Sequence, residues 1–192
     1  MELYEAIEKR RTIRIYKNGA SEEQLRKILL AGTKAPSAVN RQPWEFIHIQ
    51  DRKTIDQLAD LKYQQTLGDP PKNADEVGGA EKIARGQKDS FQNASIVAVC
   101  HLKDWEKSVW LCLENISLAA VAEGLGSGIV LFWGETKEKV ESILGLPEDY
   151  ELTAVMKLGE PGKDGYSRDA NPYAQKRPEF SWLHRDRFGQ RD

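Results

Sequence analysis

The sequence predicts one domain that mixes helices and strands. The chain has 192 residues, which is enough for one hydrophobic core and makes one domain the natural count. Two runs, 94–102 and 151–158, have the length and apolar composition of buried strands. Elsewhere in the chain, apolar residues recur at helical spacing after residues that typically cap helices.

The composition excludes several classes of protein. Hydrophobic residues make up 40% of the chain and charged residues 30%, as in an ordinary globular protein. The net charge of -2 gives no general attraction for nucleic acid or for an anionic membrane. No apolar run is long enough to span a bilayer. Residues 1–11 mix acids and bases without an apolar block, which argues against a signal peptide, so we expect a cytoplasmic location.

Cysteine and histidine positions give no sign of a disulfide or a metal site. Cys100 and Cys112 fall in a predicted strand and a predicted helix, and we expect two free, buried thiols rather than a disulfide. His48, His101 and His184 form no cluster in the sequence, so we expect no metal site.

Residues 10–14 read R-R-T-I-R and follow a predicted first helix. Leu3, Ala6 and Ile7 stand at helical spacing, so that helix should bury a narrow face and end at the arginines. An extended segment would divide its side chains between two sides, with Arg10, Thr12 and Arg14 on one and Arg11 and Ile13 on the other. Guanidinium groups bind phosphate through paired hydrogen bonds, so the first side suits a phosphate. A solvated charge run is the alternative.

The next two helices are predicted by their caps. The capping box Ser21 to Gln24 starts one helix, which ends before residue 36. Asp51 caps another through residue 62. Beyond it, residues 69–80 contain two prolines and two glycines with few large apolar side chains, so we expect a surface loop or lid within a segment of about 63–92.

The arc from Pro36 to Gln42 is predicted to be stiff, because Pro36 and Pro43 restrict their own backbone and that of the residues before them. The arc carries polar side chains and leads through Trp44 into a strand at 45–50. We interpret it as a preorganised ligand wall with Trp44 as its aromatic plane. The alternative is a capped loop that packs Trp44 into the core.

The second half of the chain supplies the remaining elements. The helix 108–123 is apolar nearly all round, so we expect burial on most sides and infer that a second subunit covers one of them. The glycines of 124–128 are predicted to end this helix and to open a strand at 129–133. Thr136 should cap the following helix, and 159–162 should stop the last strand.

Five motifs in this order resemble the FMN-dependent nitroreductases. They are R-R-T-I-R at 10–14, A-P-S-A-V-N-R-Q-P-W at 35–44, L-A-A-V-A-E-G-L-G-S-G at 118–128, L-G-L-P-E-D-Y at 144–150 and L-G-E-P at 158–161. The resemblance covers nearly the whole chain. It implies an α+β fold with a central, mostly antiparallel sheet flanked by helices. It also implies an intertwined homodimer with FMN at each subunit interface.

The same resemblance implies which residues hold FMN. Arg10 and Thr12 would bind the phosphate and ribityl chain, while Arg14 would lie by the N1 edge of the ring, where a cation favours the reduced form. The backbone of residues 132–134 would pass alongside the ring and donate an N–H to N5. The complete predicted set is Arg10, Arg11, Thr12 and Arg14; Pro36, Ser37, Ala38, Asn40 and Gln42, lent to the partner subunit; Phe132, Trp133 and Gly134; and the C-terminal pair Lys176 and Arg177.

The implied activity is hydride transfer from NAD(P)H through the flavin to a nitroaromatic, a quinone or a similar acceptor. No catalytic side chain is needed, because the chemistry belongs to the cofactor. A reductive dehalogenase or flavin-fragmenting enzyme of the same fold is one alternative, and a non-catalytic flavin- or phosphate-binding module is another.

The sequence departs from the family pattern in two places. The segment 63–92 matches no subgroup of the family, and Trp133 stands where some relatives have an acidic residue. We expect one domain over 1–192, with a tail at 172–192 packed on the partner subunit.

Overall fold

A computed structural model describes residues 1–163, 178 and 180–190 of the chain. The strands are β1 (Tyr16–Gly19), β2 (Trp44–Ile49), β3 (Ser95–Leu102), β4 (Gly126–Val130) and β5 (Tyr150–Pro161). The helices are α1 (Leu3–Lys9), α2 (Glu22–Gly32), α3 (Arg52–Gly68), α4 (Ala80–Asp89), α5 (Glu106–Ala122) and α6 (Gly134–Leu144). Two short 3-10 turns, η1 (Ala38–Asn40) and η2 (Ala74–Val77), lie between them.

The strands form one five-stranded sheet in the order β1-β5-β3-β2, with β4 paired to β5 beside this path. All four ladders are antiparallel. β3 lies between β2 and β5, and its six central residues are buried, as the apolar run predicts. The α+β class with an antiparallel sheet is therefore confirmed.

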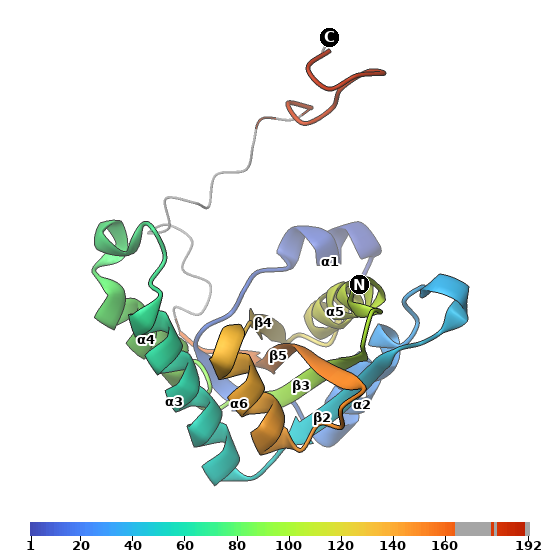
Figure 1. Cartoon of the computed structure of the whole chain (residues 1–192). Helices are drawn as coiled ribbons and strands as arrows, with labels where there is room; N and C mark the ends of the chain where they lie inside the picture. Colours follow the sequence, from blue (N-terminus) through green and yellow to red (C-terminus); the bar gives the residue numbers. More distant parts are fainter. Residues whose placement is uncertain (164–177, 179, 191–192) are drawn as a thin grey trace.

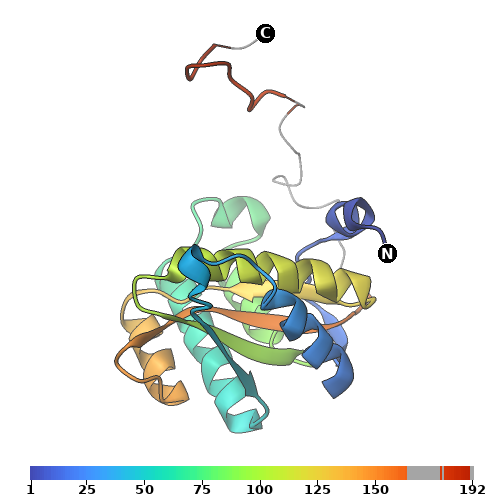
Figure 2. The same cartoon turned by 90° about the vertical axis from the view of Figure 1, so that its right-hand side faces the viewer.

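Helices cover both faces of the sheet (Figures 1 and 2). α2 and α5 pack on one face, where they share a hydrophobic cluster with β3 and β5. α3 and α6 pack on the other face, around a second cluster that also contains Phe91. α4 packs on α3. The sheet is therefore the middle layer of three.

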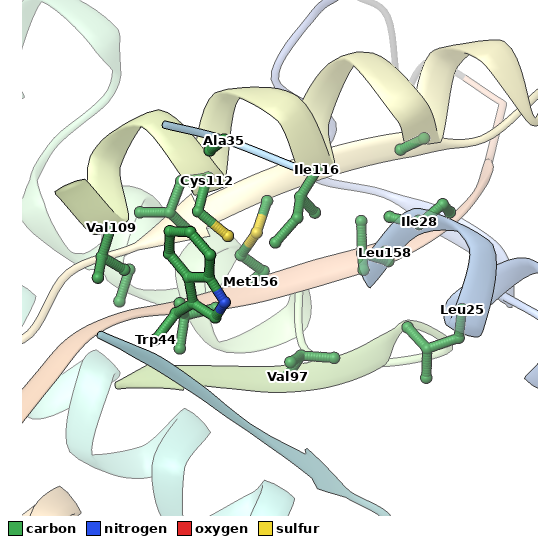
Figure 3. Close-up of a cluster of buried hydrophobic side chains, with 14 of the residues drawn as sticks. Leu25, Ile28, Ala35, Trp44, Val97, Val109, Cys112, Ile116, Met156 and Leu158 are labelled. Carbon is green, nitrogen blue, oxygen red and sulfur yellow. The ribbon is translucent and has the colours of Figure 1, made fainter. Parts of the chain in front are cut away.

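Trp44 belongs to the core rather than to a ligand wall. Its side chain is 7% exposed and lies in the cluster beneath α5, among Val109, Cys112 and Met156 (Figure 3). The interpretation of Trp44 as an aromatic plane for a ligand was wrong, because burying an indole ring gains more than leaving it at the end of an exposed loop. Cys100 and Cys112 are free and buried, as expected.

Two of the three predicted helix caps, Ser21 and Asp51, are confirmed. The Ser21 hydroxyl accepts a hydrogen bond from the backbone N–H of Gln24 at 3.2 Å, and the Gln24 side chain accepts one from the N–H of Ser21 at 3.1 Å. The Asp51 carboxylate accepts the N–H of Thr54 at 2.8 Å. These local bonds satisfy helix N–H groups that have no partner within the helix, so the starting points of α2 and α3 can be predicted without tertiary information.

Other boundaries were predicted incorrectly. β4 covers Gly126–Val130 instead of 129–133, and α6 begins after Trp133, so Thr136 lies inside the helix instead of capping it. β5 does not stop at residue 159 but continues to Pro161, because β1 pairs with its last residues. β1 itself was not predicted. Only the first of its four residues is buried, so it has little alternating pattern to detect.

The expected lid is largely helical. α3 continues through residue 68, η2 follows, and α4 occupies 80–89. Only residues 69–73 and 78–79 between these helices, and 90–92 after α4, lack helical structure. α4 escaped prediction because it is short and polar, with Ala84 its one residue classed as buried among those whose burial is described. Whether the segment closes over a site remains a prediction.

Apolar side chains remain exposed on α1 and α5. In α1 only Ala6 is buried, while Leu3 and Ile7 are 61% and 45% exposed, so the predicted narrow face is not buried within one chain. In α5, seven residues are buried, as predicted, while Trp110 and Leu111 are exposed, so one side of this helix is left uncovered by its own chain. Exposed apolar faces of this kind are typical of interaction surfaces.

Candidate functional site

The arginine segment is extended and lies beside β4. Thr12 forms a parallel bridge with Ser127, and the N–H of Ile13 donates to the Ser127 carbonyl at 2.8 Å. Ile13 is fully buried, whereas Thr12 and Arg14 are exposed, which is the alternation predicted from the sequence. Since the two strands run in parallel, Arg14 lies toward the end of β4 from which residues 131–134 leave the sheet.

Gly128 makes this close approach possible. A Cβ atom there would lie 2.6 Å from the carbonyl oxygen of Ile13, 2.9 Å from the Tyr16 hydroxyl and 3.1 Å from Cε of Lys157. The Tyr16 hydroxyl in turn donates to the carbonyls of Ile13 at 2.9 Å and Lys157 at 3.2 Å. The glycine therefore lets the segment 12–14 rest directly on β4.

Arg10 and Arg11 have different surroundings. The Arg10 side chain is 37% exposed, and its Nε lies 3.7 Å from a carboxylate oxygen of Glu114 on α5. An exposed pair at this distance contributes little, so Arg10 stays available to another anion. The Arg11 guanidinium donates to the carbonyls of Glu8 and Arg10 at the end of α1. Its predicted contact with a cofactor remains untested.

Two side chains of α3 hold residues 131–134 in place through hydrogen bonds to their backbone. Lys62 donates to the Leu131 carbonyl at 3.1 Å, and the Gln65 amide donates to the Trp133 carbonyl at 3.2 Å. The Phe132 side chain is buried, so only its backbone can face a ligand, while Trp133 is 44% exposed.

The N-terminus of α6 is open. Gly134 has φ of 56°, in the left-handed region that favours glycine, and no atom from outside its chain neighbours and its own helix backbone lies within 4 Å of the position of a Cβ. No side chain caps the helix, which leaves its first N–H groups able to bind an acceptor. This geometry fits the predicted backbone contact to a cofactor.

Two buried lysines lie close to these segments. Lys62 is 7% exposed and Lys157 is 2% exposed. Burial lowers the pKa of Lys62 to about 8, against the opposing charge of Asp69. Burial, followed by the charges of Arg14 and Lys62, lowers the pKa of Lys157 to about 7. No salt bridge joins either lysine to a carboxylate in the part of the chain that the structure describes. Buried cations usually have anionic partners, so this concentration of positive charge fits an acceptor-rich ligand.

Neither lysine was identified from the sequence. Lys157 interrupts the otherwise apolar run T-A-V-M-K-L, and a charge inside a buried strand could have served as the signal. Lys62 was identified only as part of a helix face. Its role depends on a hydrogen bond to the carbonyl of Leu131, a residue far away in the sequence.

The arc 36–42 projects from the body of the chain, and in Figure 1 it lies on the opposite side of α5 from residues 10–14. Val39, Asn40 and Gln42 all have positive φ, which is an outlier conformation for the β-branched valine. The Ser37 hydroxyl accepts the N–H of Gln42 at 2.9 Å and braces the arc. A stiff, exposed and strained loop is typical of a binding element.

One chain therefore brings together only part of the predicted set. Residues 10–14 lie beside β4, which leads directly into residues 131–134, while the arc lies apart from them (Figure 1). Lys176 and Arg177 lie outside the described residues. The described tail residues Phe180, Trp182 and Phe188 are exposed, and their predicted packing on a partner subunit is untested.

The described residues offer no metal site and no membrane span. They contain no group of three or more histidine, cysteine, aspartate or glutamate side chains able to hold a metal ion. Among them, no helix has both the length and the apolar character needed to cross a bilayer.

Comparison with known proteins gives one consistent result. Residues 7–160 match the model of the Nitroreductase family. NADH dehydrogenase of Thermus thermophilus is 33% identical over 178 residues, covering 82% of this chain and 86% of that protein. A crystal structure of oxidised iodotyrosine deiodinase bound to FMN and 3-iodo-L-tyrosine superposes with a TM-score of 0.70 at 26% identity, covering 88% of this chain and 95% of that one. An FMN-dependent nitroreductase from Clostridium difficile shares the fold, with a TM-score of 0.67 at 22% identity and coverage of 95% and 98%.

Proposed function

Because the chain belongs to the nitroreductase family, we propose that it binds FMN and transfers hydride from NAD(P)H to an electron-poor acceptor such as a nitroaromatic or a quinone. The observation that carries this proposal is the cation-rich edge of β4. Thr12 pairs with Ser127 of β4 in the extended segment that also contains Arg10 and Arg14, and buried Lys157 lies opposite Gly128 of β4. Buried Lys62 donates to the Leu131 carbonyl just beyond β4. The deiodinase structure bound to FMN, at 26% identity, supports the choice of cofactor.

The chain's own residues have distinct roles in this proposal. Arg10 and Thr12 hold the phosphate end, where a guanidinium and a hydroxyl match phosphate oxygens. Arg14 favours negative charge on the ring, and the uncapped start of α6 supplies backbone N–H donors. FMN, when bound, supplies the hydride-transfer chemistry. The protein contributes orientation and electrostatics, and no side-chain nucleophile takes part.

The proposal includes a homodimer with one FMN at each subunit interface. Within one chain the arc 36–42 lies apart from residues 10–14, so the arc can complete a site only on another subunit (Figure 1). The exposed apolar faces of α1 and α5 would be covered in the same assembly.

Turnover of a nicotinamide cofactor tests the activity. Purified protein supplied with FMN should oxidise NADH or NADPH steadily with a simple quinone or nitroaromatic as acceptor. Omitting the acceptor controls for slow reaction with oxygen. Tight uptake of FMN without turnover of either nicotinamide, and without reduction of any acceptor by the chemically reduced enzyme, would identify a non-catalytic flavin-binding module instead.

Reductive dehalogenation is the second candidate function. The similarity to iodotyrosine deiodinase over 88% of the chain favours it specifically. Release of iodide from 3-iodo-L-tyrosine by the chemically reduced enzyme, faster than reduction of a quinone by the same enzyme, would support this function over the first.

A further inference from the structure

Lys157 is an unusual residue for its position. It lies in β5, opposite Gly128 of β4, with both neighbours in the strand buried in the core. Its ammonium nitrogen donates to the Ser90 hydroxyl at 2.5 Å and lies 5.6 Å from the centre of the Phe91 ring. A hydroxyl and an aromatic face compensate a buried charge only in part.

Among the described residues, the groups that act on Lys157 are neutral or positive. Tyr16 of β1 contacts its backbone carbonyl, and Ser90 at the end of α4 accepts its ammonium hydrogen. Arg14 and Lys62, from the segment beside β4 and from α3, add positive charge. Cε of Lys157 lies close to Gly128, on which residues 12–14 rest. Lys62 donates a hydrogen bond to the Leu131 carbonyl. The Lys157 side chain therefore lies next to Gly128, where residues 12–14 rest on β4, and its charge is felt together with those of Arg14 and Lys62.

We propose that Lys157 tunes the redox chemistry of this site: together with Arg14 it favours negative charge on the bound ring and so raises the reduction potential. This inference rests on the proposed FMN site. In the absence of a ligand, a buried cation destabilises the fold. When the ring accepts electrons, the same cation gains an anionic neighbour in a medium where charges interact far more strongly than in water.

The buried Lys157 should make the stability of the FMN-free protein depend on pH. Lysine in the unfolded chain titrates near 10.5, whereas burial lowers the pKa of Lys157 in the folded protein to about 7. Between these two values the unfolded chain binds a proton that the folded chain has lost, so stability rises with pH across this window. Replacing Lys157 with methionine removes the free-energy cost of burying its charge. FMN-free Lys157→Met should therefore melt at a higher temperature than the wild type, by a larger margin at pH 6.5 than at pH 9.

The midpoint potential of bound FMN distinguishes an electrostatic role of Lys157 from a role in packing alone. In Lys157→Met, reduced FMN should lose roughly tenfold more affinity than oxidised FMN, which corresponds to a midpoint potential lower by about 30 mV for a two-electron couple. Ser90→Ala, which removes the acceptor of the ammonium, should shift the potential in the same direction but less, and it provides the test if Lys157→Met fails to fold. Lys139→Met removes an equal charge from a side chain that is 62% exposed, and should leave the potential unchanged.

Two results would overturn the proposal. An unchanged midpoint potential in both the Lys157 and the Ser90 variants, with FMN bound, removes the redox role and leaves the proposed function intact. A lower melting temperature of FMN-free Lys157→Met at both pH values makes Lys157 a structural residue. If the wild type takes up no FMN at all, the proposed function itself fails.

Discussion

Arg10→Ala is expected to weaken FMN binding by roughly ten- to a hundredfold, because a charge-assisted hydrogen bond contributes about 1.5 to 3 kcal/mol. The existing partner of Arg10, Glu114 at 3.7 Å, is too exposed to compete strongly for the guanidinium. The midpoint potential of enzyme that still carries FMN should change little, since the phosphate keeps its charge in both redox states. Fluorescence titration and spectroelectrochemistry give the two quantities.

Arg14→Gln serves as the contrasting variant in the same segment. Oxidised flavin is neutral at N1, so this change should spare most of its affinity and weaken the reduced form, and linkage then requires a lower midpoint potential. Arg52→Ala, which removes an arginine that is 54% exposed at the start of α3, controls for the loss of one positive charge. Equal loss of affinity for both redox states in Arg14→Gln would make Arg14 a second phosphate ligand.

Gly128→Ala is expected to destabilise the protein by about 1 to 3 kcal/mol and to reduce FMN affinity as well. The new methyl group would lie 2.6 Å from the backbone oxygen of Ile13, so the arginine segment itself has to move. Chemical denaturation and FMN titration of the same preparations measure both effects.

Gly86→Ala is the matched control for this substitution. Gly86 lies within α4, and no atom from outside its chain neighbours and the backbone of α4 lies within 4 Å of its Cβ position. Alanine should therefore stabilise the protein by about 0.5 to 1 kcal/mol, without affecting FMN binding. A Gly128→Ala protein with wild-type stability and affinity would show that residues 12–14 are not held against β4 as described.

The features that the sequence predicted correctly depend on short-range chemistry. The capping box at Ser21 and the Asp51 cap each involve residues within three positions of one another. The central strand β3 is apolar along its length, so its burial on both faces needs no knowledge of its neighbours. The alternation within residues 10–14 follows from extended geometry alone.

The features that escaped prediction depend on contacts between distant parts of the chain. β4 begins at Gly126 because Ile13 packs over that residue, which the glycine run itself cannot reveal. Trp44 could serve a ligand or the core, and only the position of α5 above it decides between them. Lys62 is an ordinary lysine in the sequence, and Lys157 differs only by its apolar neighbours. Both become distinctive once the fold buries them away from carboxylates.

The central claim is that two chains together bind FMN between residues 10–14 of one subunit and the arc 36–42 of the other. The most direct measurement is a titration of FMN-depleted protein with FMN, combined with the mass of the complex in solution. We predict a yellow dimer that binds one FMN per chain. Protein that takes up no FMN, or a stable monomer that retains it, would contradict the claim.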